Sequence, residues 1–200
     1  KKEMPQTLSR DQAEALKRVT GEGFAAARDV FLMCLLLDHG LRVAEVAGLT
    51  IESIYLTLGL LRFYRPNVAR AQVHRLSPAT REAARIYLNL LGKRDPSAAL
   101  FRRIKRNGQP GCQPLTARAI AIRVQALGAG LGLAHLSPHD CRHYWATAAA
   151  HGGTDPFSLQ EAGGWSSLAM PRRYIDQAMI ANSGVRLDPP DSKRQPDDQE

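Results

Sequence analysis

The 200-residue chain has little cysteine, and Cys34, Cys112 and Cys141 are odd in number and lack metal-ligand spacing. Three such cysteines are typical of reduced cytosolic thiols, and not of a disulfide framework or a zinc site. Long apolar runs are also missing, since the longest, Val30 to Leu37, falls far short of the ~20 residues that a membrane helix needs. The polar start KKEMPQTLSRDQ leads directly into an expected helix, so we expect no signal peptide. These absences predict a cytoplasmic protein that does not span a membrane.

Acidic residues are fewer than basic ones, which gives the chain a formal net charge of +8. The tail from Asp188 to Glu200 carries −3, so residues 1–187 carry +11. Such a basic body indicates a polyanionic partner, with nucleic acid as the first candidate and an anionic membrane as the second. A generic soluble surface remains the plain alternative. Ten arginines lie between Arg62 and Arg106, and arginine is suited to bidentate phosphate contacts.

Capping residues and apolar periodicity predict a mostly α fold with one small antiparallel β-sheet, α+β in class. The sheet is expected between Thr50 and Leu76, where β-branched and aromatic residues gather, with a loop at 66–70. Segment 93–114, rich in Arg, Gly and Pro, is expected to be mostly loop, and the charged tail 188–200 to be disordered. The expected helices are 10–19, 24–38, 42–48, 78–91, 117–127, 139–150, 156–162 and 170–180.

Arg42 lies among apolar neighbours in GLRVAEVAGL, and this pattern predicts a half-buried cation. A buried cation needs an anionic partner. Glu45, one helical turn further on, is the plain choice. The alternative is a phosphate oxygen, with Glu45 holding the guanidinium group in place.

His139 and Arg142 are three residues apart, so both side chains project from one face of the expected helix. His139 also lies in the first turn, where free N–H groups and the helix dipole favour anions. An HxxR pair alone is more often a terminal histidine beside a surface arginine. The small and aromatic residues of HDCRHYWATAAA favour a buried Arg142 instead, with Asp140 pointing elsewhere.

Trp165 and Tyr174 lie 23 and 32 residues after Arg142. Most tryptophans are core residues, although the indole N–H can donate to a phosphate oxygen. A tyrosine in MPRRYIDQ is usually an amphipathic surface residue. As a nucleophile it needs cations nearby, and Arg172 and Arg173 precede it.

The order of these five residues resembles the catalytic signature of the tyrosine recombinases, or phage integrase family. The resemblance rests on GLRVAEVAGL and on SPHDCRHYWATAAAHGGTDPFSLQEAGGWSSLAMPRRYID, and it covers roughly residues 7–185. It implies a catalytic domain over residues 1–187. Family members usually carry a separate helical DNA-clamping domain before this one, and we expect that domain to be absent from this sequence.

The resemblance also implies a reaction, in which Tyr174 attacks a DNA phosphate and forms a 3′-phosphotyrosyl bond. Arg42 and Arg142 would clamp the non-bridging oxygens, and His139 would bind the phosphate and manage the tyrosine proton. Trp165 would donate its N–H and pack the pocket. No metal, cofactor or small-molecule substrate is expected. The partner would be double-stranded DNA, bound by a homotetramer on paired sites, with residues 175–187 as a possible tetramer contact.

One family feature is missing, because the lysine usually found on the sheet's β-turn has no counterpart among residues 50–76. That lysine acts as a general acid toward the leaving 5′-oxygen, and Asn67 is expected to hold its place. Either Arg65, Arg70 or His74 substitutes for it, or the protein is slow, or the lysine was changed.

The sequence therefore leaves three functions open. The first is site-specific DNA recombination or integration. The second is a DNA-binding relative that no longer cuts DNA, and the third is relaxation of DNA as by a type IB topoisomerase. The small size and the short interval between Trp165 and Tyr174 favour the first over the third.

Overall fold

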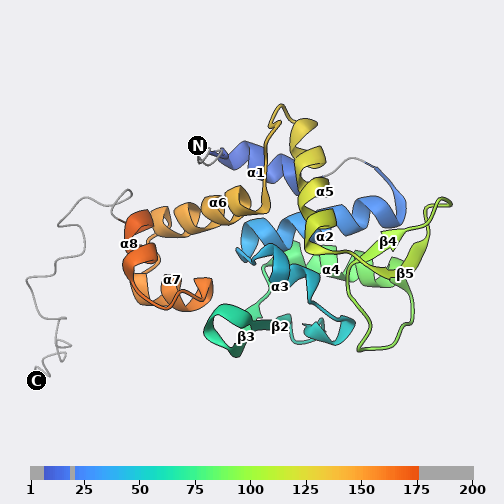
Figure 1. Cartoon of the computed structure of the whole chain (residues 1–200), viewed down its shortest axis with the longest axis horizontal. Coiled ribbons are helices and arrows are strands. Elements are labelled where there is room, and N and C mark those ends of the chain that lie inside the picture. The colour runs from blue at the N-terminus through green and yellow to red at the C-terminus, as the bar shows by residue number, and fades with distance from the viewer. Residues whose placement is uncertain (1–6, 19–20, 176–200) are drawn as a thin grey trace, which may run out of the picture.

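The computed structural model describes residues 7–18 and 21–175, which form a mostly helical fold with two small antiparallel sheets (Figure 1). In this part of the chain the helices are α1 (Arg10–Leu16), α2 (Gly23–Asp38), α3 (Val43–Ala47), α4 (Pro78–Leu91), α5 (Ala117–Ala129), α6 (Pro138–His151), α7 (Pro156–Gly163) and α8 (Ala169–Ile175). The strands are β1 (Ile54–Tyr55), β2 (Leu60–Arg65), β3 (Arg70–Arg75), β4 (Arg102–Ile104) and β5 (Pro110–Pro114). Residues 176–187 and the tail 188–200 lie outside the described residues.

Helix α2 lies at the centre of the fold and packs against α1, α3, α4 and α6. Every residue from Phe31 to Leu37 is at most 3% exposed, as expected for a central helix whose sequence is apolar on nearly all sides. Phe31 also contacts the rings of Tyr87 and Phe101. Burial of such side chains contributes about 1.5–3 kcal/mol each.

Local capping chemistry sets most of the helix starts where the sequence predicts them. The side chains of Ser9, Ser77, Thr116, Ser137 and Asp155 each accept a hydrogen bond from a first-turn backbone N–H. These bonds satisfy donors that have no partner within the helix. Helices α2 and α4 end where expected, at Asp38 and Leu91, whereas α1 ends three residues before and α5 two residues after the expected end.

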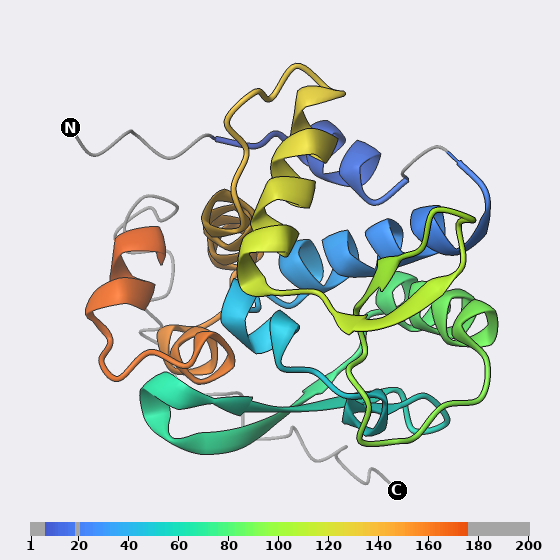
Figure 2. The same ribbon diagram turned by 45° about the vertical axis from the view of Figure 1, so that its right-hand side comes forward.

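The first sheet has the order β1-β2-β3, and β2 and β3 pair from Leu60↔Arg75 to Arg65↔Arg70. Alternation along β2 buries Leu61, Phe63 and Arg65 on one face. A 3-10 turn, Pro66–Val68, closes this hairpin. The hairpin reaches α7 (Figure 2), where the Gln72 amide donates to the Glu161 carbonyl at 2.7 Å.

The expectation that segment 93–114 is mostly loop is wrong in part, because β4 and β5 pair within it as a second antiparallel sheet. The strands are three and five residues long, interrupted by a register shift, and prolines stand at both ends of β5. Proline and glycine normally argue against a strand. The Pro and Gly content of this segment therefore does not reveal the short hairpin, which packing with the rest of the fold supports.

A second, small core joins α6, α7 and α8. It consists of Ala146, Ala150, Leu159, Tyr174 and Ile175, with Trp145 and Trp165 packed against it. Tyr174, which was expected to lie at the surface, is therefore buried.

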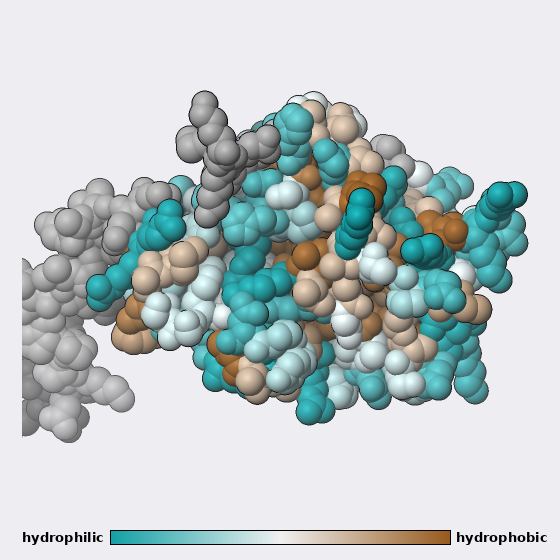
Figure 3. All heavy atoms as spheres, in the orientation of Figure 1, coloured by the Kyte–Doolittle hydropathy of each residue, from teal (hydrophilic) through white to brown (hydrophobic). Residues whose placement is uncertain are grey.

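The face of the molecule drawn in Figure 3 carries hydrophobic residues in small patches among hydrophilic ones. Within residues 7–18 and 21–175, none of the helices combines the length and apolar character that crossing a membrane requires.

Candidate active site

Arg42 is the N-cap residue of α3, and Glu45 fixes it in two ways. The Arg42 backbone N–H donates to Glu45 Oε2 at 2.8 Å, and the guanidinium donates to Oε1 at 3.0 Å. The Arg42 side chain is 24% exposed, whereas that of Glu45 is 1% exposed. The predicted Arg42–Glu45 partnership is therefore confirmed, and the Arg42 side chain remains partly exposed.

Arg142 projects from α6 into the interior, as the sequence predicts. Its guanidinium donates to the carbonyl of Gly40 and, at 2.5 Å, to the carbonyl of Gly163, and it lies 4.6 Å from the centroid of the Trp165 ring. Burial, together with the charges of Arg42 and Arg65, lowers the pKa of Arg142 to about 9.

Asp140 completes the N-terminal cap of α6. Its carboxylate accepts hydrogen bonds from the backbone N–H of Ser137 at 2.9 Å and from the Ser137 hydroxyl at 2.7 Å. This arrangement agrees with the expectation that Asp140 points elsewhere than toward Arg142.

Arg65 is the residue that sequence analysis undervalued. Its side chain is 0% exposed and donates to Glu45 at 3.2 Å, to the Gly163 carbonyl at 3.0 Å and to the Ala162 carbonyl at 2.5 Å. Its Nε donates to the Gln72 side chain. Burial and the neighbouring Arg42 lower the pKa of Arg65 to about 10, although Glu45 opposes the shift. The period-two alternation of β2 was the available signal, because it places Arg65 on the same face as Leu61 and Phe63.

Three guanidinium groups thus meet at one carbonyl oxygen, that of Gly163. Arg42, Arg65 and Arg142 donate to it at 3.4, 3.0 and 2.5 Å. We call these three side chains the arginine cluster. They come from α3, β2 and α6, which are far apart in sequence, and the oxygen belongs to the C-terminal end of α7. Such a concentration of donors is suited to an anionic oxygen.

Trp165 and Tyr174 lie beside the arginine cluster. The Trp165 ring packs between Arg142 and Tyr174, with ring centroids 5.9 Å apart for the two aromatic residues. Tyr174 is 6% exposed. Burial raises the pKa of Tyr174, while the charges of Arg142 and Arg173 act in the opposite direction.

His139 lies in the first turn of α6 and is exposed. Among the described residues, no hydrogen bond or ring contact joins it to the other four predicted site residues. His143, one turn further on, packs edge-on against the Tyr174 ring, with centroids 5.2 Å apart. Burial, then the neighbouring His139, lowers the pKa of His143. Sequence analysis missed this contact, for which the four-residue interval from His139 was the available signal.

The three possible substitutes for the missing lysine occupy different environments. Arg65 enters the arginine cluster, whereas the Arg70 side chain is 50% exposed and pairs with Glu161 at 2.5 Å. The Nε2 atom of His74 is buried and has no hydrogen-bond partner among the described residues. Asn67 is exposed in the 3-10 turn, and no contact with the cluster is found for it in the described part of the chain.

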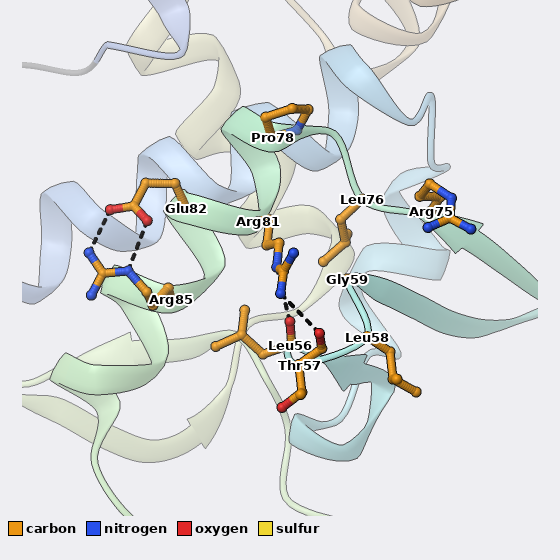
Figure 4. Close-up of a pocket in the computed structure, with 10 residues that line it drawn as sticks. All are labelled: Leu56, Thr57, Leu58, Gly59, Arg75, Leu76, Pro78, Arg81, Glu82 and Arg85. Atoms are coloured by element: carbon orange, nitrogen blue, oxygen red, sulfur yellow. Dashed lines mark hydrogen bonds and ion pairs between the residues drawn. The ribbon is translucent and has the colours of Figure 1, made fainter.

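A separate hollow of about 670 Å³ lies between the β1–β2 turn and α4 (Figure 4). There Arg81 donates to the carbonyls of Leu56 and Thr57, and Arg85 pairs with Glu82. None of the predicted site residues lines this hollow. Across residues 7–18 and 21–175, no three His, Cys, Asp or Glu side chains gather in a way that could hold a metal ion.

Comparison with known proteins places this geometry in a family. The sequence profile of the phage integrase family matches residues 6–180. The chain is 32% identical over 174 residues to tyrosine recombinase XerC of Azotobacter vinelandii, covering 86% of this chain and 56% of the relative. It is 33% identical over 175 residues to tyrosine recombinase XerC of Pelobacter propionicus, covering 86% and 55%. The chain therefore spans little more than half the length of these relatives.

Solved structures show the same fold. The XerA recombinase superimposes with a TM-score of 0.69 at 22% identity, covering 86% of this chain and 61% of that one. The Tn1549 transposon integrase, solved in complex with transposon right end DNA, gives 0.69 at 20% identity, covering 86% and 62%. The family match over most of the sequence and the XerC identities together establish that this chain belongs to the phage integrase family of tyrosine recombinases.

Proposed function

We propose that this protein binds double-stranded DNA and performs site-specific recombination by cutting and rejoining strands through Tyr174. The observation that carries the proposal is the convergence of three guanidinium groups on one oxygen, with the Trp165 and Tyr174 rings packed alongside. The relatives at 32–33% identity are named tyrosine recombinases, and XerH and Tn1549 integrase neighbours were solved with DNA.

In the proposed reaction the Tyr174 oxygen attacks the scissile phosphorus and the bond from phosphorus to the 5′-oxygen breaks. The phenol loses its proton, the 5′-oxygen gains one, and a 3′-phosphotyrosyl bond remains. Attack by a 5′-hydroxyl from a partner strand reverses these steps. Catalysis then depends on positioning and electrostatics, because the bonds that form and break are those of the phosphorus atom.

Each of the five predicted residues has a role in this proposal. Arg42 and Arg142 bind the non-bridging oxygens and stabilise the charge that develops in the transition state. Trp165 orients Arg142 and donates its N–H. His139 binds the phosphate from the first turn of α6, and it reaches the tyrosine proton only after a rearrangement, since His143 is the histidine that contacts Tyr174.

Burial of Tyr174 has a consequence for this reaction. A phenol that is 6% exposed cannot reach a DNA phosphate until α8 shifts. We therefore propose that DNA binding and assembly on paired sites, as a homotetramer, bring α8 into position. We further propose that residues 1–187 form the catalytic domain, and that the protein acts in the cytoplasm on DNA.

The test is a nicked suicide DNA substrate, which traps the covalent intermediate because the short 5′-fragment diffuses away. The natural chain should form an adduct that resists denaturation, and Tyr174→Phe should form none. Tyr144→Phe is the matched control, since it removes a phenol from α6 and should leave the adduct intact. DNA binding without an adduct at any pH would exclude the proposed cleavage.

A further inference from the structure

The arginine cluster carries more positive charge than its partners offset. Glu45 is the carboxylate that the described residues bring into ion-pair contact with it, through Arg42 and Arg65. Three guanidinium groups and one carboxylate leave an excess of two positive charges. The remaining acceptors are neutral, and they include the carbonyls of Gly40, Ala162 and Gly163. An excess of buried charge is costly unless an anion compensates it.

Arg65 contributes to this excess as fully as the two arginines predicted from sequence. It donates to the same oxygen of Gly163 as Arg42 and Arg142, and at a shorter distance than Arg42. Burial lowers the pKa of Arg65, but only to about 10, so its guanidinium group remains charged at neutral pH.

The cover over Arg65 is a glycine turn, Gly163–Gly164. A Cβ atom on Gly164 would lie 2.5 Å from Cδ of Arg65, so only glycine allows the backbone to lie this close. Gly164 also has a φ of 59°, a conformation that glycine adopts readily. Glycine also adopts more backbone conformations than other residues, so the turn has alternatives to its present conformation. A phosphate oxygen is a stronger acceptor than the carbonyl that it would replace.

We infer that Arg65 is a third phosphate-binding cation, which donates to the scissile phosphate with Arg42 and Arg142 once the Gly163 carbonyl gives way. The inference rests on the proposed function and adds to it a catalytic residue on the β2–β3 hairpin. Its contribution is charge and hydrogen bonding at the non-bridging oxygens. It does not deliver the proton that the leaving 5′-oxygen needs.

Three suicide substrates separate these contributions. The first carries an ordinary phosphate. The second carries a methylphosphonate, in which a methyl group replaces one non-bridging oxygen and removes one negative charge. The third carries a 5′-bridging sulfur, a leaving group that departs without a proton. Arg65→Gln removes the charge and keeps a polar side chain, and Arg62→Gln, which changes an exposed arginine of β2, is the control on the same hairpin.

Arg65→Gln should slow cleavage of the ordinary phosphate by about 100-fold or more. It should slow cleavage of the methylphosphonate much less, and the sulfur substrate should not restore the rate. Arg62→Gln should cleave all three substrates like the natural chain. Thermal unfolding and DNA affinity, measured for each variant, show whether the fold is intact. If Arg65→Gln does not fold, Arg65→Lys takes its place. Its cleavage rates should fall less, and the ordinary and sulfur substrates should again be slowed more than the methylphosphonate.

Other outcomes overturn the inference. Rescue by the sulfur substrate would make Arg65 a proton donor. An equal loss on all three substrates would make it a positioning residue, and no loss would remove it from the reaction. An adduct from the natural chain with any of these results leaves the proposed function standing, whereas the absence of that adduct rejects the proposed function itself.

Discussion

Glu45 is the residue on which the arginine cluster depends most. Its carboxylate is 1% exposed and holds Arg42 at 3.0 Å and Arg65 at 3.2 Å. Glu45→Gln keeps the shape but leaves both cations without a carboxylate, so we expect a loss of roughly 3–5 kcal/mol in the free energy of unfolding. Urea denaturation of the natural chain and the variant measures it.

Glu161→Gln is the matched control for that prediction. Glu161 also pairs with an arginine, Arg70, but its side chain is 64% exposed. Solvent screens such a pair, so the urea midpoint should hardly move. Equal midpoint shifts for the two variants would show that burial does not decide how much the Glu45 carboxylate stabilises the fold.

His74 should make stability depend on pH. Burial, and then the charges of Arg65 and His39, lower the pKa of His74 to about 3. The ordinary value is 6.5, so the unfolded chain binds more protons than the folded chain between about pH 3 and 6.5. The contribution of neutral His74 is therefore fully present above pH 6.5 and is lost as the pH falls toward 3.

The measurement is the thermal midpoint of unfolding at pH 7 and at pH 4.5. His74→Gln should show a smaller decrease between these pH values than the natural chain, because it removes a group that takes up a proton on unfolding. Two further groups face His74: Arg142 also lowers its pKa, and the Ala162 backbone opposes the shift. His151→Gln, which changes an exposed histidine, should retain the full decrease. A decrease in His74→Gln identical to that of the natural chain would show that His74 does not contribute to the pH dependence of stability.

At the scale of elements, the Gly163–Gly164 turn joins the helices around the site. It ends α7, lies against Arg65 and leads into Trp165. Gly164→Ala introduces a Cβ both in a left-handed conformation and against the Arg65 side chain. We expect lower stability and a large loss of DNA cleavage, measured by thermal unfolding and by the suicide substrate.

Gly153→Ala separates the effect of backbone strain from the effect of contact with Arg65. Gly153 has a φ of 81°, and a Cβ there would meet nothing within 4 Å. This variant bears the backbone strain alone, roughly 1 kcal/mol, and should keep full cleavage activity. If both variants cleave DNA equally well, the close approach of the turn to Arg65 has no part in the reaction.

At the scale of the whole molecule, positive charge is unevenly distributed. Between Asp95 and Asp140 the sequence contains six arginines and lysines and no acidic residue. The β4–β5 hairpin presents three of them, Arg103, Lys105 and Arg106, as exposed side chains. A surface of this kind favours contact with DNA phosphates at a distance from the arginine cluster.

We therefore expect the double variant Lys105→Ala, Arg106→Ala to change the salt dependence of DNA binding. The slope of log K against log salt concentration should become shallower by about 0.9 for each DNA phosphate that the hairpin no longer neutralises. Cleavage at saturating DNA should remain unchanged. Fluorescence anisotropy at several salt concentrations measures the slope. An unchanged slope would place the DNA away from this hairpin.

The sequence by itself determined what local chemistry controls. Helix starts followed from side chains such as Ser77 and Ser137, whose capping hydrogen bonds with the backbone reach only three residues along the chain. The central position of α2 followed from its apolar character on all sides. The site residue types and their order followed from short motifs, and the match to the phage integrase family bears out that resemblance.

Tertiary structure decided what depends on distant segments. Arg65 enters the arginine cluster because α7 supplies carbonyl oxygens 97 and 98 positions further along the chain. His143, and not His139, contacts Tyr174 because α8 folds back on α6. The short strands β4 and β5 form against their local composition. The partners that fix Arg65 and His143 lie outside their own stretches of sequence, so a local pattern can suggest these side chains but cannot specify their contacts.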